Sequence, residues 1–255
     1  MATNTRLVMV GNIPVGGGHE APVQTMWKEP LHGLDTRKAL DVIRRLSLLG
    51  CRILRFSVPD MDSANALGSL ASACGMPLVA DIHFDWRLAL RCLDFPIAKI
   101  RVNPGNLGEQ WKLTEVAQKA SDKGVPIRVG VNAGSLAKDL EVLPDRAQAL
   151  VLSAERELEA LDALGFSNVI VSMKASNVEE TLRCNRLFAA RHDVPLHIGV
   201  TEAGPLVQGC IRSAVAMHAL LAEGIGDTLR VSLSSAMEDE VLAGREILAL
   251  ATGRR

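Results

Sequence analysis

The sequence predicts an α/β fold, a (β/α)8 TIM barrel with a short amino-terminal hairpin, and three observations lead to this prediction. Eight apolar, strand-like runs alternate with helix-like patterns. Glycine or proline stands at several junctions between a helix and the next strand. The length of 255 residues is close to the roughly 250 residues typical of this barrel. A doubly wound open sheet is the alternative, but no Gly-x-Gly-x-x-Gly motif follows the first predicted strand.

The elements are expected in regular alternation after a hairpin extension within residues 1–20. Segment 7–18 ends in three glycines, and we interpret it as a hairpin that caps one end of the barrel, since no Lys-Ser or Lys-Thr pair follows to form a phosphate loop. The predicted strands cover residues 23–26, 53–58, 78–82, 99–103, 127–132, 169–174, 196–201 and 228–233. A turn is expected at 104–106, and the clearest helical patterns cover residues 36–49, 111–123, 146–164, 207–221 and 239–250. Without a linker or low-complexity segment, residues 1–255 are expected to form one domain.

The overall composition argues against several classes of function. The net charge is −1 and no run of about 18 apolar residues occurs, so we expect neither charge-driven nucleic-acid binding nor a membrane span. The start of the chain lacks the apolar region of a signal peptide, and a cytoplasmic location is expected. The five cysteines are widely spaced, so we interpret them as buried hydrophobic residues, with no metal or iron–sulfur site formed by this chain alone.

Four predicted strands place an arginine on the same face as a Ser, Asn or Gly two residues later. The segments are LRFS at 54–57, IRVN at 100–103, IRVG at 127–130 and LRVS at 229–232. Because side chains alternate along a strand, the arginines are expected to point into the barrel and the apolar residues to face the helices. A buried cation without a partner costs several kcal/mol, and too few acidic residues lie at comparable positions to neutralise them all. The pattern therefore indicates a negatively charged ligand.

The polar residues collect where the predicted strands end, and barrel enzymes place their active sites at that end. Arginine presents a rigid fork of donors and lysine a mobile point charge, so the set favours a diphosphate ligand. The alternative is a structural network in which the arginines pair with Asp81, Asp85 and Glu202. The candidate binding residues are Arg55, Asp81, Arg101, Asn103, Arg128, Asn132, Lys174, Ser176, Thr201, Arg230 and Ser232.

Two further residues are candidates for proton transfer. Glu202, at the end of the seventh strand, is the candidate donor of a proton to a leaving hydroxyl, and a structural salt bridge is the alternative role. His83 is expected to act as a hydrogen-bonding or acid–base group. The i, i+2, i+4 spacing of Asp81, His83 and Asp85 also matches a divalent metal site, but five neighbouring cations would repel the ion. We therefore expect no metal.

Eight segments resemble the 4-hydroxy-3-methylbut-2-enyl diphosphate synthase family. They are VGNIPVGGG at 10–18, PVQTM at 22–26, LVADIHFD at 78–85, IRVNPGNLG at 100–108, IRVGVNAGSL at 127–136, VSMKAS at 171–176, HIGVTEAG at 197–204 and GIGDTLRVSL at 224–233. They occur in family order through nearly the whole chain, which makes the resemblance specific.

The resemblance implies an oxidoreductase barrel of the non-mevalonate pathway of isoprenoid biosynthesis. Its substrate would be 2-C-methyl-D-erythritol 2,4-cyclodiphosphate, whose ring the family opens while removing a hydroxyl group with two electrons. By resemblance, the diphosphate would be held by Arg55, Arg101, Arg128, Lys174 and Arg230 with Asn103, Asn132 and Ser232. The carbon skeleton would be surrounded by Asp81, His83, Thr201 and Glu202. A homodimer and an electron donor such as ferredoxin or flavodoxin are also implied.

The chain departs from the family in two places. The family continues into a second domain, where three cysteines and one glutamate hold a [4Fe–4S] cluster, and this sequence is expected to end about where that domain begins. The cluster is therefore expected from a partner domain or chain, and this chain alone is expected to be inactive. WKEP at 27–30 replaces the Thr- and Asn-rich run of the family. The alternatives are a non-catalytic barrel that binds or senses a diphosphate and, third, a metal-dependent enzyme.

Overall fold

The computed structural model describes residues 5–103 and 107–253, and the turn expected at 104–106 lies outside them. The strands of the barrel are β3 (Gln24–Met26), β4 (Ile53–Ser57), β5 (Leu78–Asp81), β6 (Lys99–Val102), β7 (Ile127–Asn132), β8 (Val169–Lys174), β9 (His197–Ile198) and β10 (Thr228–Leu229). Strands β3 to β8 form one parallel sheet in sequence order, and β9 pairs with β10. Parallel bridges join Val171 to Leu196 and Val23 to Leu229, which connect β8 to β9 and β10 to β3. The sheet thus closes on itself, and the predicted TIM barrel is confirmed.

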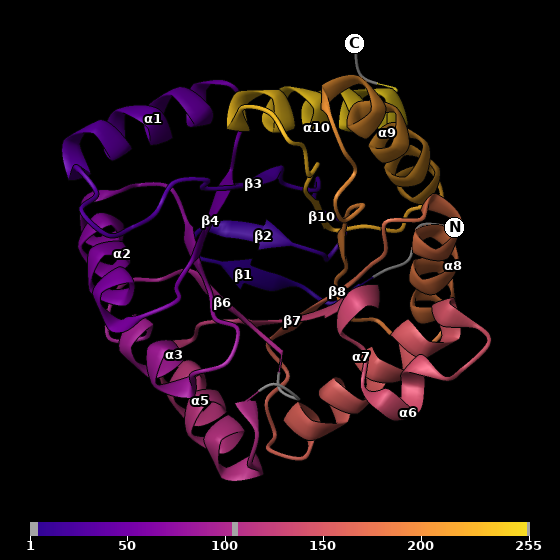
Figure 1. The fold of residues 1–255 in the computed structure, drawn as a ribbon, viewed down its shortest axis with the longest axis horizontal. Helices are drawn as coiled ribbons and strands as arrows, with labels where there is room; N and C mark the ends of the chain where they lie inside the picture. Colours follow the sequence, from indigo (N-terminus) through magenta and orange to yellow (C-terminus); the bar gives the residue numbers. More distant parts are fainter. Residues whose placement is uncertain (1–4, 104–106, 254–255) are drawn as a thin grey trace.

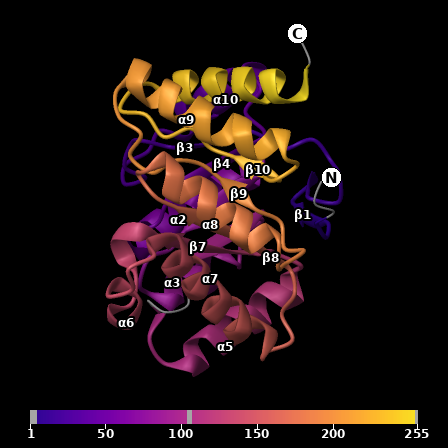
Figure 2. The same cartoon turned by 90° about the vertical axis from the view of Figure 1, so that its right-hand side faces the viewer.

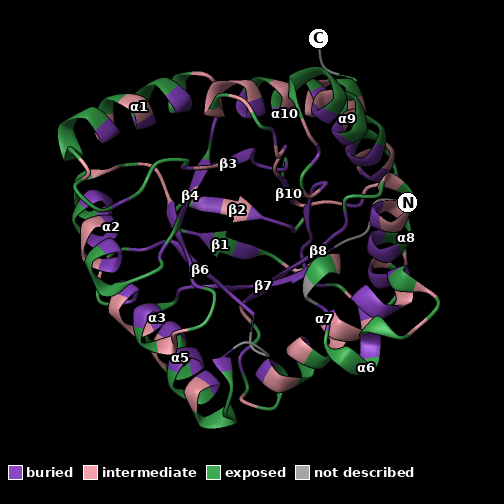
Figure 3. Ribbon diagram, viewed as in Figure 1, coloured by how far each residue is buried: buried purple, intermediate pink, exposed green. Residues whose placement is uncertain are grey.

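The helices form a ring outside the strands (Figure 1). They are α1 (Thr36–Leu48), α2 (Met61–Ala73), α3 (Trp86–Cys92), α5 (Gln110–Lys123), α6 (Lys138–Glu141), α7 (Arg146–Asp162), α8 (Val178–Ala189), α9 (Leu206–Ala222) and α10 (Met237–Thr252). Several begin at a residue whose side chain accepts a backbone N–H of the first turn, as Asp60 does from Ser63 at 2.7 Å. Buried residues of the longer helices lie on the side that faces the strands (Figure 3), so an apolar layer surrounds the barrel. The five helices located from the sequence agree with the structure within two residues at each end.

A hairpin of β1 (Val8–Val10) and β2 (Ile13–Val15) covers one end of the barrel. Its buried side chains pack against Ile53, Val79, Ala98 and Ile170, which lie at or near the starts of barrel strands. Figures 1 and 2 show the hairpin crossing the barrel in one view and lying to one side of the strands in the other. The expected hairpin is therefore confirmed, and it closes the amino end, which leaves the carboxyl end for a ligand.

Strands β9 and β10 are shorter than the expected 196–201 and 228–233. Gly199 lies so close to the segment after β10 that a Cβ atom there would be 2.5 Å from the carbonyl oxygen of Arg230. Backbone contacts continue beyond the regular ladder, because Arg230 N–H donates to Ile198 O at 3.1 Å and Thr201 N–H to Ala175 O at 3.0 Å. The barrel wall is therefore continuous but irregular at these two strands. Within the described ranges, no helix has both the length and the apolar character needed to cross a membrane.

Candidate functional site

A cavity of about 120 Å³ lies inside the barrel at the carboxyl ends of the strands. Its position follows from the lining residues, since Asp81, Asn132 and Lys174 are each the last residue of a strand. The full lining is Arg55, Asp81, His83, Arg101, Arg128, Asn132, Ser172, Lys174, Val200, Thr201, Arg230 and Ser232. The structure thus brings together side chains from seven strands or their extensions and places all four strand arginines on one cavity.

Three of the residues expected at the site do not line this cavity. Asn103 is buried directly after β6, whereas Ser176 and Glu202 are exposed in the loops after β8 and β9. Glu202 has a backbone φ of 50°, in the left-handed region that non-glycine residues rarely adopt. The site therefore has a cationic interior and a rim that carries the candidate proton donor.

Asp81 organises one side of the cavity. It is 2% exposed, and its carboxylate lies 3.2 Å from Arg101 Nη1 and 3.5 Å from Arg55 Nε. His83 Nε2 lies 3.5 Å from the same carboxylate. Burial alone would raise the pKa of Asp81, but Arg55, His83 and the other arginines outweigh it and hold that pKa well below its usual range. Asp81 is therefore an ionised anchor for two arginines.

Arg128 and Lys174 form the uncompensated part of the cavity. Arg128 is 1% exposed, and its Nη1 donates to Ser172 Oγ at 2.8 Å, while Nε and Nη2 have no partner. In the described part of the chain, no carboxylate forms a salt bridge with either cation. Burial, followed by the repulsion of neighbouring cations, lowers the pKa of both side chains. Both cations therefore have the capacity to bind an added anion.

Glu240, which the sequence prediction missed, is the acidic partner of Arg230. It does not line the cavity itself. It lies on α10, is 0% exposed, and accepts from Arg230 Nε and Nη2 at 3.4 Å each. No signal in the sequence distinguishes it from its neighbours Glu238 and Asp239, because acidic residues are common in the first turn of any helix. Its role follows only from where α10 packs.

A deeper polar layer lies beneath the cavity and consists of residues outside the expected binding set. The ammonium group of Lys99, fully buried, donates to Gln24 Oε1 at 3.3 Å. Both ring nitrogens of buried His197 lack a partner in the described part of the chain. Burial, followed by nearby Lys174, lowers the pKa of this histidine. The alternation that located Arg101 would have located Lys99, since the two residues share a face of β6.

Two glycines make room for the side chains of Arg101 and Lys174. A Cβ atom at Gly130 would lie 2.5 Å from Nε of Arg101, and one at Gly199 would lie 3.1 Å from Nζ of Lys174. Glycine in a strand interior often marks such a close approach. The guanidinium and ammonium groups therefore occupy space that any other residue at these positions would fill.

The described residues do not fit a metal or a [4Fe–4S] cluster. Asp85, one of the three residues with metal-like spacing, instead caps α3 by accepting from Arg87 N at 3.0 Å. Within residues 5–103 and 107–253, no three His, Cys, Asp or Glu side chains gather into a metal site. The cysteines are separate, and burial raises the pKa of Cys184 to about 12, which disfavours the thiolate that a metal needs.

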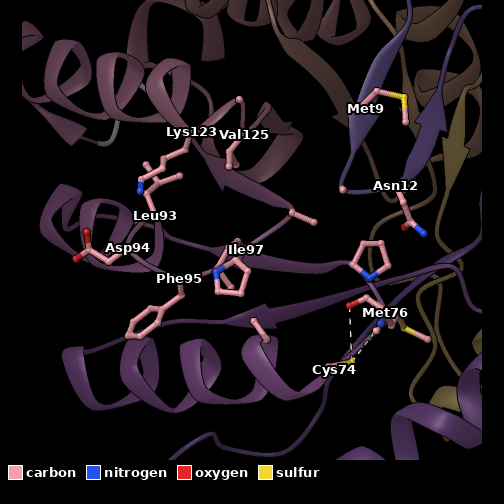
Figure 4. A pocket seen from close by; sticks show the side chains of 17 residues that line it. Met9, Asn12, Cys74, Met76, Leu93, Asp94, Phe95, Ile97, Lys123 and Val125 are labelled. Atoms are coloured by element: carbon pink, nitrogen blue, oxygen red, sulfur yellow. Dashed lines mark hydrogen bonds between the residues drawn. The ribbon is translucent and has the colours of Figure 1, made fainter.

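A second, larger hollow of about 640 Å³ lies at the opposite end of the barrel, beside the hairpin. Figure 4 shows Met9, Asn12 and Met76 on one side of it and Leu93 and Phe95 on the other. Its lining mixes polar and apolar surface, and its charged lining residues, Asp94 and Lys123, have opposite signs, unlike the like charges inside the barrel. The smaller cavity is therefore the candidate functional site.

Comparison with known proteins agrees with the TIM-barrel fold of this chain. Residues 5–245 match the family model of the GcpE TIM-barrel domain. Among similar relatives, the 4-hydroxy-3-methylbut-2-en-1-yl diphosphate synthase (flavodoxin) of Treponema pallidum is 51% identical over 249 residues, covering 93% of this chain and 62% of the relative. The synthase of the same name from Geobacter sulfurreducens is 49% identical over 253 residues, covering 97% and 70%. The chain thus spans about two thirds of the length of these relatives.

Solved structures of dihydropteroate synthases share the architecture. The enzyme from Yersinia pestis has a TM-score of 0.69 at 11% identity, with 97% of each chain covered. The enzyme from Xanthomonas albilineans bound to 4-aminobenzoic acid has a TM-score of 0.68 at 11% identity, with 98% of each chain covered. At this identity the similarity concerns the barrel fold alone. The family match and the identity to the synthases are far more specific, and they show that the chain belongs to the GcpE family, whose TIM-barrel domain it contains.

Proposed function

We propose that this chain is the substrate-binding barrel of a 4-hydroxy-3-methylbut-2-en-1-yl diphosphate synthase, and that its cavity binds 2-C-methyl-D-erythritol 2,4-cyclodiphosphate. The observation that carries the proposal is the charge imbalance of the cavity. Five cationic side chains line it, and the carboxylates in contact with them are those of Asp81 and Glu240. With all five protonated, an excess of three positive charges faces the ligand. A cyclic diphosphate offers the charge and the many acceptor oxygens that such a site requires.

The proposed roles follow from which donors are already in use. Arg128 and Lys174 bind the phosphate oxygens most directly, because their charges have no carboxylate partner. Arg55 and Arg101 bind from a position fixed by Asp81, and Arg230 from one fixed by Glu240. The remaining proposed contacts are those of Asn103, Asn132, Ser176 and Ser232 with the diphosphate, and of His83 and Thr201 with the carbon skeleton.

Glu202 is the proposed proton donor for the hydroxyl group that leaves during the reductive opening of the ring. Its side chain is exposed at the rim, one residue after the cavity residue Thr201. A left-handed non-glycine residue stores strain that is often found at functional positions, and this supports the assignment. The proposal requires the loop to bring the carboxyl group over the cavity.

The electrons are proposed to come through a [4Fe–4S] cluster held by a further domain or a partner chain, because the described residues do not fit one. The names of the relatives specify flavodoxin, and a flavodoxin or a ferredoxin is the proposed reductant. A homodimer is part of the same proposal. This chain then contributes binding, orientation and a proton, and its partner contributes the redox chemistry.

Calorimetric titration of the purified chain with the cyclodiphosphate tests the proposal. Arg101→Ala and Arg230→Ala are each expected to weaken binding by about 1.5–3 kcal/mol, the range for hydrogen bonds to charged groups. Arg156→Ala is the matched control, since Arg156 forms a surface salt bridge with Asp139 at 2.7 Å. Absence of binding by the unaltered chain would refute the proposal.

A second experiment distinguishes the proposed enzyme from a barrel that only binds the diphosphate. Mixed with a cluster-bearing domain and reduced flavodoxin, the chain is expected to convert the cyclodiphosphate. Tight binding without turnover in that mixture would instead support the diphosphate-sensing barrel. Metal retained by the purified chain, with loss of activity on chelation, would support the metal-dependent alternative.

A further inference from the structure

We propose that Lys28, Thr25 and Glu240 form a clamp across the seam between the first and last strands of the barrel, and that this clamp positions Arg230 for the ligand. The inference rests on the proposed function, because it assigns a further positioning role within the same site. It concerns the segment 27–30, which directly follows β3.

The seam between β3 and β10 has few backbone contacts. β10 is two residues long, and its junction with β3 is the single bridge between Val23 and Leu229. The neighbouring contacts are Leu229 N–H to Pro22 O at 3.3 Å and Thr228 Oγ1 to the same oxygen at 3.0 Å. By contrast, β7 and β8 are paired over six residues. Side chains must therefore hold the carboxyl end of the seam, where Arg230 lies.

Glu240 is the centre of the clamp. Its carboxylate accepts from Thr25 Oγ1 at 2.6 Å and from Leu233 N–H at 3.0 Å, and it lies 3.1 Å from Lys28 Nζ. These donors come from β3, from the segment after β10, and from the loop after β3, so one buried carboxylate joins three parts of the seam. Burial opposes ionisation, but Arg230 and the other donors outweigh it and lower the pKa of Glu240.

The contacts of Lys28 are with groups of the protein around the seam, and Lys28 does not line the cavity. Besides Glu240, its Nζ donates to Leu233 O at 3.0 Å and to Ser235 O, both in the loop that follows β10. Trp27, which precedes it, is 5% exposed and stacks on Phe56 with ring centroids 5.3 Å apart. The stacked ring fixes the start of the loop, so the lysine reaches across the seam rather than into the cavity.

The geometry of Arg230 shows why this matters for binding. Its two contacts with Glu240 are both 3.4 Å, longer than the roughly 2.7–2.9 Å of a strong charge-assisted hydrogen bond. Lys28 and Thr25 occupy the carboxylate closely, so Glu240 holds Arg230 only loosely and leaves its guanidinium facing the cavity. If Lys28 lost its charge, Glu240 would draw Arg230 closer and away from the ligand.

Titration calorimetry with the cyclodiphosphate on the full chain tests the binding half of the inference. Lys28→Met is expected to weaken binding about tenfold, within the range of coupling between contacting residues. Lys28→Arg is expected to restore it, and Lys38→Met, which removes an exposed lysine of α1, serves as the control. In an Arg230→Met background, Lys28→Met is expected to have no further effect. An equal loss in both backgrounds would overturn the positioning role and leave only a structural one.

A ligand-free measurement keeps the inference distinct from the proposed function. The side-chain Nε–H signal of Arg230, assigned by its absence in Arg230→Lys, is followed by nuclear magnetic resonance. Lys28→Met is expected to shift it as the contact with Glu240 shortens, and Lys28→Arg is expected to leave it in place. A shift without any binding of cyclodiphosphate would support the clamp and refute the proposed function. An unchanged signal in Lys28→Met would refute the clamp itself.

Discussion

Replacing Arg128 with methionine is expected to stabilise the ligand-free chain while weakening its binding of the diphosphate. The side chain is 1% exposed, and among residues 5–103 and 107–253 its Nη1 donates to Ser172 while Nε and Nη2 have no partner. Exchanging buried ionic groups for apolar ones of similar size stabilises proteins by about 1–4 kcal/mol in favourable cases. Since Arg128 lacks even an ion-pair partner, its removal is expected to raise the free energy of unfolding by about 1–3 kcal/mol.

The effect on binding has the opposite sign. The two open donors of Arg128 are those that reach phosphate oxygens, and a hydrogen bond to a charged group contributes about 1.5–3 kcal/mol. Loss of both is therefore expected to cost about 3 kcal/mol or more, which corresponds to an affinity roughly 100-fold lower. Urea denaturation without ligand and calorimetric titration measure the two effects on the same preparation.

Arg101→Met is the matched comparison, because Arg101 is also buried but is paired with Asp81 at 3.2 Å and with Gly130 O at 2.9 Å. Its removal leaves a buried carboxylate with fewer partners and is expected to destabilise the ligand-free chain by about 1–3 kcal/mol. If Arg128→Met destabilised the chain as much as Arg101→Met, or bound the diphosphate as tightly as the unaltered chain, Arg128 would not be a cation reserved for a ligand.

Three further outcomes are expected. His197 has a lowered pKa, so the unfolded chain takes up a proton there before the folded chain does; stability should fall as pH drops below about 6.5, and His197→Asn should reduce this slope in urea denaturation. Gly130→Ala should displace the Arg101 guanidinium and weaken diphosphate binding about tenfold, with the melting temperature lowered no more than by Arg101→Met, whereas Gly199→Ala meets the Arg230 carbonyl and should mainly lower that temperature. Cyclodiphosphate at about 100 times its Kd should stabilise the chain by about 2.7 kcal/mol in denaturant titration, and no protection would contradict binding to the folded state.

Much of the fold follows from local patterns in the sequence. The first six barrel strands agree with their expected ranges within one residue at each end, because their apolar outer faces and polar inner faces are regular. The last two do not, because their pairing ends where Gly199 approaches the backbone of Arg230. That close approach depends on how two distant segments pack. The apolar pattern of 196–201 and 228–233 therefore does not predict it.

The same distinction applies to the candidate site. Residues within strands, such as Arg55 and Arg101, were located by the two-residue alternation, which fixes the direction of a side chain. Ser176 and Glu202 lie beyond the strand ends, where this alternation no longer determines direction, and both are exposed. Glu240 reaches the site from a helix, so its role depends on tertiary packing. The sequence therefore predicts the interior of the cavity well and its supports poorly.

The two carboxylates give the cavity an uneven distribution of charge. Asp81 is shared by the arginines of β4 and β6, and Glu240 is shared by Arg230 and Lys28. Arg128 and Lys174 lie between them on β7 and β8, with no carboxylate partner among the described residues. These two strands share the longest ladder of the barrel, with six paired residues that include Asn132 opposite Lys174. A long ladder resists the mutual repulsion of the cations that it carries, because moving either one would break several backbone hydrogen bonds at once. The two cations without a carboxylate partner are thus located on the longest ladder of the barrel wall, and under the proposed function the diphosphate would complete their charge balance.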